Sequence, residues 1–138
     1  MSIKRNFSIL GRIFGRWGII HDIRQNIKFF IQRGRKGYCD KDLWEINTWF
    51  SQTVSRMMKE FSKKNLAYPE TSDTICPGYN EMSEEEKYRR WTELTYQIGI
   101  LLEKSVGYTY PWEQDETRIH AKDKAFDLMR DNFFDLWW

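Results

Sequence analysis

The sequence contains few of the residues on which several protein classes depend: two cysteines, two histidines and three prolines among 138 residues. Two cysteines are too few for a disulfide framework, so we expect Cys39 and Cys76 as reduced thiols of a reducing cytoplasm, with one disulfide between them as the alternative. No apolar run approaches the ~20 residues of a membrane span. Arg12 and Arg16 interrupt the apolar N-terminal stretch, so a secretory signal is not expected.

Catalytic and metal-binding patterns are also sparse. His21 and His120 are the only histidines, so the sequence has too few of them for a histidine-rich metal site and offers little for a histidine-centred triad. His120, Asp123 and Asp127 share one helical face, which an exposed polar face explains as well as a metal site does. The glycine-rich stretch 11–18 lacks both the dinucleotide spacing and a Walker lysine. The sequence predicts a protein that is not an enzyme and uses no metal or cofactor.

The chain does have material for a core, since 41% of its residues are hydrophobic, including seven Trp, seven Tyr and nine Phe. A chain of this length buries roughly two-thirds of its unfolded surface and typically forms one domain. We therefore predict a single helical domain over residues 1–138. One small bundle is not expected to cover so many aromatic side chains, and large exposed apolar patches mark interfaces, so we expect a homo-oligomer.

Charge is distributed unevenly along the chain. Residues 1–38 carry nine basic residues against Asp22 alone, a net charge of +8, whereas residues 39–138 carry 13 basic and 19 acidic residues, a net charge of −6. Such a split is typical of an arm that faces phosphate, acidic lipid or an acidic partner. The alternative is that the basic segment packs on the acidic remainder, within one molecule or across an oligomer.

Hydrophobic spacing predicts helices throughout. Residues 1–33 form a basic amphipathic segment, as one long helix or two, whose apolar positions recur every three or four residues. The tract 34–37 (Gly-Arg-Lys-Gly) then ends the pattern. The apolar positions of this segment are Ile3, Phe7, Leu10, Phe14, Trp17, Ile20, Ile23, Ile27 and Phe30.

A second helix is predicted near 41–64, where Asp42 and Glu45 have the spacing of a capping box. The adjacent carboxylate Asp40 is also more typical of helix capping than of an acid/base pair, because alternate helical residues do not face each other. An acidic, proline-containing loop follows over 66–82. The apolar face expected of this helix consists of Leu43, Ile46, Phe50, Val54, Met57 and Phe61.

A third helix is predicted to begin at Ser83, which has Glu86 three residues later, and to end at Gly107 before an aromatic connector over 108–111. A last helix covers about 114–136. The predicted fold class is an all-α bundle of four to five helices. The third helix would bury Tyr88, Trp91, Leu94, Ile98 and Leu101, and the last helix Ile119, Phe126, Met129, Phe133 and Leu136.

The stretch Gln32–Trp49 contains the motif Gly-Tyr-x-Asp-x-Asp-Leu-Trp at 37–44. This motif resembles one in uncharacterised small all-helical proteins of tailed bacteriophages. Those proteins also place a proline-containing loop, a Trp-led helix and a closing Leu-Trp-Asp after it, which Tyr68-Pro69, Trp91 and Leu136-Trp137 match, although residue 138 is Trp rather than Asp. The resemblance implies an accessory phage protein in the cytoplasm of the infected bacterial host, with counter-defence among its roles, and supplies no catalytic residues.

Two classes of function then fit. In the first, the protein binds a small anionic ligand or a host defence protein, and sequestration of a nucleotide-type immune signal is one form that this binding could take. Cations would meet phosphate, aromatic rings would stack on a base, and a carboxylate would accept from a base edge or orient an arginine. The alternative is that the tryptophans are core and the arginines a solvated turn. The candidate ligand-binding residues are Arg33, Arg35, Lys36, Tyr38, Asp42, Trp44 and Trp49.

In the second class, the basic segment 1–33 lies on an anionic membrane surface or on nucleic acid. Apolar residues flanked by Arg and Lys are typical of interfacial helices, although a packed bundle helix has the same period. DNA is the less favoured partner, because the acidic remainder would repel phosphate and no recognition-helix motif is present.

Overall fold

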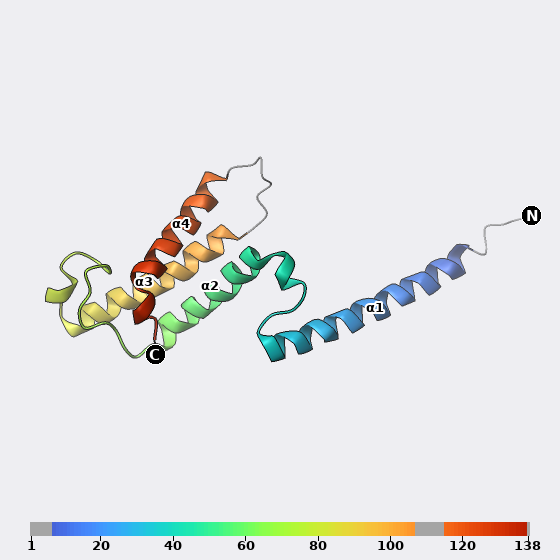
Figure 1. Ribbon diagram of the computed structural model, residues 1–138, viewed down its shortest axis with the longest axis horizontal. Helices are drawn as coiled ribbons and strands as arrows, with labels where there is room; N and C mark the ends of the chain where they lie inside the picture. The colour runs from blue at the N-terminus through green and yellow to red at the C-terminus, as the bar shows by residue number, and fades with distance from the viewer. Residues whose placement is uncertain (1–6, 107–114, 138) are drawn as a thin grey trace, which may run out of the picture. The chain divides into compact units, whose positions relative to one another are not determined.

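The computed structural model describes residues 7–106 and 115–137, with side chains from residue 20 onward. These residues contain four α-helices and no strand, so the all-α prediction is confirmed (Figure 1). Gly107 and the connector 108–111 lie outside the described residues. The α-helices are α1 (Phe7–Lys36), α2 (Ile46–Lys64), α3 (Glu84–Ser105) and α4 (Glu116–Asp131), and short 3-10 helices cover Asp42–Trp44, Tyr79–Glu81 and Phe133–Asp135.

The chain divides into two compact units, which we call unit 1 (residues 1–46) and unit 2 (residues 47–138). The prediction of one domain over the whole chain stays a prediction. In unit 1, α1 is one continuous helix rather than two. It runs three residues beyond the expected end at 33 and stops where Gly37 adopts a left-handed φ of 79°. The amide of Gly37 donates to the carbonyl of Arg33, which is the usual way such a glycine closes a helix.

The start of the second helix was predicted wrongly. Residues 42–44 form a separate 3-10 helix, and α2 begins only at Ile46. Asp42 does not cap α2, because its carboxylate is bonded instead to the Arg33 guanidinium and to the amide of Cys39. Leu43 and Ile46, expected on a buried face, are exposed.

In unit 2 the core is built around α3, whose N-terminus is as predicted. Ser83 caps the helix by accepting a hydrogen bond from the Glu86 amide at 3.3 Å. Three glutamates in the first turn complement the positive end of the helix. The buried cluster consists of Met58, Trp91, Leu94, Ile98, Leu101, Leu102, Ala121 and Ala125.

The buried face of α2 differs from the prediction in a way that the packing explains. Met57 is exposed, while three serines and Met58 are buried. Gly99 of α3 leaves room for close approach: a Cβ there would lie 2.9 Å from the carbonyl oxygen of Ser55. The Ser55 hydroxyl donates to the Gly99 carbonyl at 2.7 Å, so its polar group is satisfied at the interface. The buried serines are Ser51, Ser55 and Ser62.

Helix α4 also packs through small residues. Ala121 and Ala125 are buried, whereas Ile119 is exposed. The Phe126 side chain is nearly half exposed and stacks on Phe50 of α2, with the ring centroids 5.7 Å apart. The helix ends at Asp131 and Phe133 is exposed, so the predicted end near 136 was wrong. Met129 and Leu136 pack against the core as expected.

A buried tyrosine fixes the conformation of the loop 66–82. The Tyr79 side chain is buried and its hydroxyl donates to the carbonyl of Pro69 at 2.7 Å. Burial raises the pKa of Tyr79 to about 12. Cys76, in the same loop, and Cys39 are both free thiols.

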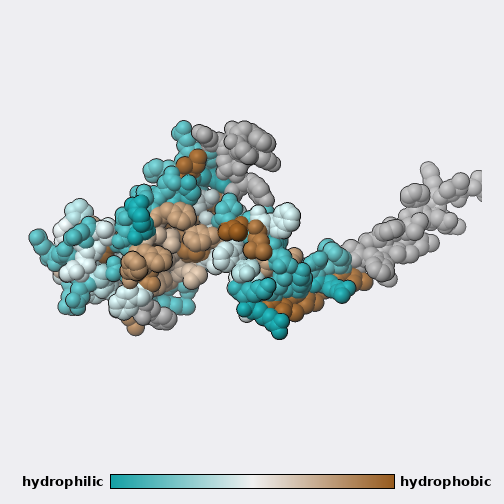
Figure 2. Space-filling model, viewed as in Figure 1, coloured by the Kyte–Doolittle hydropathy of each residue, from teal (hydrophilic) through white to brown (hydrophobic). Residues whose placement is uncertain are grey.

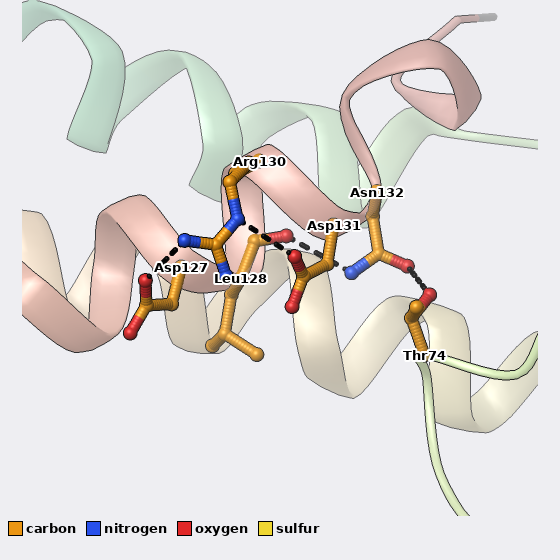
Figure 3. Close-up of polar contacts among 6 residues, drawn as sticks. All are labelled: Thr74, Asp127, Leu128, Arg130, Asp131 and Asn132. Carbon is orange, nitrogen blue, oxygen red and sulfur yellow. Dashed lines mark hydrogen bonds and ion pairs between the residues drawn. The ribbon is translucent and has the colours of Figure 1, made fainter.

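Asn132 joins the end of α4 to this loop (Figure 3). Its Nδ2 donates to the Leu128 carbonyl at 2.9 Å, and its Oδ1 accepts from the Thr74 hydroxyl at 2.9 Å. The Asn132 side chain is almost completely buried, whereas Thr74 is exposed and Leu128 is partly buried, so these two hydrogen bonds are what satisfies the buried amide.

We expect Asn132→Ala to lower the free energy of unfolding by about 1–3 kcal/mol, because it removes two hydrogen bonds of about 0.5–1.5 kcal/mol each. The matched control is Arg130→Ala, which removes ion pairs to Asp127 and Asp131 from an exposed side chain of the same segment. Surface pairs contribute at most about 1 kcal/mol, so the control should change stability little. Urea unfolding of the full-length protein measures both, and equal effects would contradict this role of Asn132.

Candidate functional site

Helix α1 presents an apolar stripe that its own unit does not cover. The five side chains recur at three- and four-residue spacing and lie on one side of the helix, and each is at least half exposed. Figure 2 shows hydrophobic residues along one side of this helix and hydrophilic residues beside them. The apolar stripe consists of Ile20, Ile23, Ile27, Phe30 and Ile31.

Basic side chains border the apolar stripe. Arg24 lies three residues before Ile27, and Arg35 four residues after Ile31, so both are neighbours of the stripe on the helix surface. Asp22 is the single acidic residue between Phe7 and Lys36. The combination of an apolar face and cationic borders is what amphipathic helices at anionic surfaces present.

After α1, the chain turns back toward the helix, and Asp42 fixes this turn. Its carboxylate accepts from Arg33 Nη2 at 2.6 Å, from Arg33 Nε at 3.0 Å and from the Cys39 amide at 2.8 Å. The Arg33 hydrogen bonds hold the pKa of Asp42 well below its usual range. The stabilisation is therefore complete above the ordinary Asp pKa of about 3.9 and is lost as the pH falls below that value toward the lowered one.

A second pair supports the same turn. Lys28 Nζ lies 2.7 Å from Asp40 Oδ2, and the Asp40 amide donates to Gln32 Oε1 at 3.0 Å. The hydrogen bond from Lys28 lowers the pKa of Asp40. Sequence reasoning missed Lys28 and Gln32, because they meet Asp40 across a turn and no helical or strand spacing relates them.

We expect Asp42→Asn to release this turn and expose the thiol of Cys39, which is 1% exposed in the structure. Hydrogen bonds to charged groups contribute about 1.5–3 kcal/mol, and Arg33 is half exposed, so labelling should accelerate by about tenfold. Reaction with a thiol reagent in a Cys76→Ser background measures the rate. Asp40→Asn is the control, since it removes an exposed pair and should change the rate by less than about threefold; equal rates for both variants would contradict the assignment.

The predicted ligand-binding residues belong to both units, six of them to unit 1 and Trp49 to unit 2. Arg35 and Lys36 are exposed in the last turn of α1, Tyr38 is exposed in the turn that follows, and Trp44, on the next 3-10 helix, is 88% exposed. Arg33 and Asp42 bind each other in the same unit, so neither side chain is presented freely. Trp49 is half-buried and belongs to unit 2. Their role in ligand binding stays a prediction.

Within the described residues, no helix combines the length and the apolar composition needed to cross a bilayer. Comparison of the chain with protein-family models, curated proteins and solved structures gives no match.

Proposed function

We propose that this protein is a non-enzymatic phage accessory protein, active in the cytoplasm of the infected cell, that binds an anionic lipid surface through unit 1. The phage assignment rests on the resemblance of residues 37–44 to small phage proteins. The choice of a surface as the partner rests on one observation, the exposed apolar stripe with cations along its border.

The extent of the stripe favours a surface over a small ligand. From Ile20 to Ile31 it runs for about 16 Å, at 1.5 Å of helix rise per residue. Full burial of each such side chain stabilises by about 1.5–3 kcal/mol, and each Lys or Arg near an anionic leaflet adds about 1 kcal/mol. The net charge of +8 over residues 1–38 supplies the electrostatic part.

A small anionic ligand, such as a nucleotide-type immune signal to be sequestered, is the second candidate. The observation that favours it is Trp44, a large and almost fully exposed ring in the same unit as Arg35 and Lys36. Base stacking and phosphate pairing would use these groups. The cations lie at the negative end of α1, however, where they already complement the helix dipole, so this candidate ranks second.

Co-sedimentation with vesicles tests the first proposal. Full-length protein should bind phosphatidylglycerol vesicles at low salt at least about tenfold more strongly than phosphatidylcholine vesicles, and the preference should shrink at 1 M salt, where the Debye length is about 3 Å. Equal binding to both vesicles, or no binding at low salt, would contradict it.

Two further measurements separate the competing uses of unit 1. Stabilisation by a nucleotide or cyclic dinucleotide in a thermal-shift panel, at about 2.7 kcal/mol for a hundredfold excess over Kd, would favour the second candidate. Light scattering tests the proposed homo-oligomer. A stable oligomer that ignores vesicles and dissociates when the apolar stripe is made polar would show that the stripe serves self-association instead.

A further inference from the structure

Unit 2 contains an apolar groove between α2 and the C-terminal segment. It encloses about 440 Å³, within the ~300–1,000 Å³ typical of small-molecule sites. Figure 2 shows hydrophobic side chains gathered on the face formed by α2 and α4. The apolar part of the lining consists of Val54, Met57, Met58, Phe61, Met129 and Leu136.

Three methionines give this groove an adaptable wall. Their side chains are unbranched and have several rotatable bonds, so they conform to chains of different shape. Met57 is 63% exposed, although it lies on the helix that supplies Met58 to the core. The groove can therefore make apolar contacts with a flexible chain along its length, and it has no rigid slot shaped for a ring.

The polar groups of the lining gather at the end of α2. Asn65 is 1% exposed; its Oδ1 accepts from the Ala67 amide at 2.9 Å, but among the described residues its Nδ2 has no hydrogen-bond partner. A buried N–H without an acceptor is costly, so an oxygen supplied by a ligand would be favoured there. Lys64 and Glu60 also line this end of the groove as an exposed ion pair, with Lys64 Nζ 3.2 Å from Glu60 Oε2, so an incoming carboxylate competes with Glu60 for the lysine.

We infer that this groove binds a single long acyl chain that ends in a carboxylate. The chain lies along Met57, Met58 and Met129, where each buried methylene adds affinity. The carboxylate lies at the Asn65 end, where it takes the place of Glu60 beside Lys64 and accepts from Nδ2 once the Asn65 side chain turns toward the groove. This site is formed by unit 2 alone and does not depend on the proposed role of unit 1.

Fluorescence titration of the full-length protein with cis-parinaric acid, a naturally fluorescent fatty acid, tests the inference. The fatty acid is kept below the concentration at which it forms micelles. We expect saturable binding with a stoichiometry of one and competition by palmitate. Hexadecanol has the same chain length without the carboxylate and should compete at least tenfold less well. Absence of saturable binding would overturn the proposal, and equal competition by the alcohol would overturn recognition of the carboxylate.

Two matched variants locate the site. Met57→Glu places a carboxylate in the groove at an exposed position, where the core does not suffer, and should weaken binding at least tenfold. Leu66→Glu makes the same change at a residue that is 83% exposed and outside the groove lining, and should stay within twofold of the wild type. Equal affinities for the two variants would exclude the groove as the site.

A third variant keeps this test apart from the vesicle experiment. Ile27→Asp/Phe30→Asp alters only the apolar stripe of unit 1 and should leave cis-parinaric acid binding unchanged. If this variant loses the fatty acid, the ligand was bound to α1 and the groove assignment is wrong. If it keeps the fatty acid but loses vesicle binding, the two sites are independent, as inferred.

Discussion

Gly99→Ala is expected to lower the free energy of unfolding of unit 2 by about 1–3 kcal/mol, the usual cost of overpacking a core. A Cβ at residue 99 would lie 2.8 Å from Lys59 Cγ and 2.9 Å from the Ser55 carbonyl oxygen. The lysine side chain can move, but the oxygen belongs to the backbone of α2. The helices must separate, and the hydrogen bond from Ser55 to Gly99 weakens with them.

The sign of this effect is informative, because helix propensity alone predicts the opposite. Alanine is favoured over glycine by about 1 kcal/mol in a helix interior. Gly34→Ala in α1 is the matched control: no described atom lies within 4 Å of the position that its Cβ would take, so stability should stay equal or rise. Urea unfolding followed by circular dichroism compares them. A Gly99→Ala protein as stable as the control would show that α2 and α3 do not pack this closely.

Ile27→Asp/Phe30→Asp should reduce partitioning onto anionic vesicles by at least a hundredfold. The two side chains are exposed, so their replacement removes apolar contact with lipid without removing a core contact. Losing the burial of two such groups costs about 3–6 kcal/mol of binding, and the added carboxylates are repelled by anionic headgroups. Vesicle titrations at low salt measure the change.

The control for this variant carries the same added charge on other faces of α1. His21→Asp/Gln25→Asp introduces two carboxylates on the side of α1 away from the apolar stripe. This control should weaken binding only through repulsion between the added carboxylates and the anionic headgroups. High salt screens that repulsion and should reduce the difference from the wild type. If both double variants lose binding equally, charge alone governs the interaction and the stripe has no specific role.

The elements that the sequence predicted well are those whose signals are local. Ser83 and Glu86 define the start of α3 by their spacing, and the stripe through Trp91, Leu94 and Ile98 marks its buried face. Such features depend only on residues within a turn or two of each other. The all-α class follows from several segments of this kind and is confirmed.

The errors arose where a distant residue decides the structure. The serine face of α2 is buried because Gly99, 44 residues away from Ser55, permits close approach, and no pattern within α2 reveals this. Asp42 has the spacing of a helix cap, but Arg33 competes for its carboxylate and holds it with two hydrogen bonds. Met57 was expected in the core and Ser55 was not, because periodicity registers only which residues are hydrophobic. It does not register how closely the facing helix approaches.

The candidate site was predictable in part. The basic, apolar character of α1 is evident from composition and spacing, so the exposed stripe agrees with the expected amphipathic segment. The groove of unit 2 was not foreseen, because Met57, Met129 and Leu136 come from segments far apart in the chain. The unpartnered amide of Asn65 likewise has no sequence signal, since an asparagine after a helix ordinarily predicts only a C-terminal cap.

The most direct test of lipid binding by unit 1 is the depth of α1 residues measured with nitroxide labels. Ile27→Cys and His21→Cys can each be labelled in a Cys76→Ser background, because the remaining thiol of Cys39 is buried. With anionic vesicles, the label at 27 should become accessible to oxygen and protected from a water-soluble nickel complex, while the label at 21 stays accessible to nickel. Equal nickel accessibility at both positions, with and without vesicles, would contradict the account.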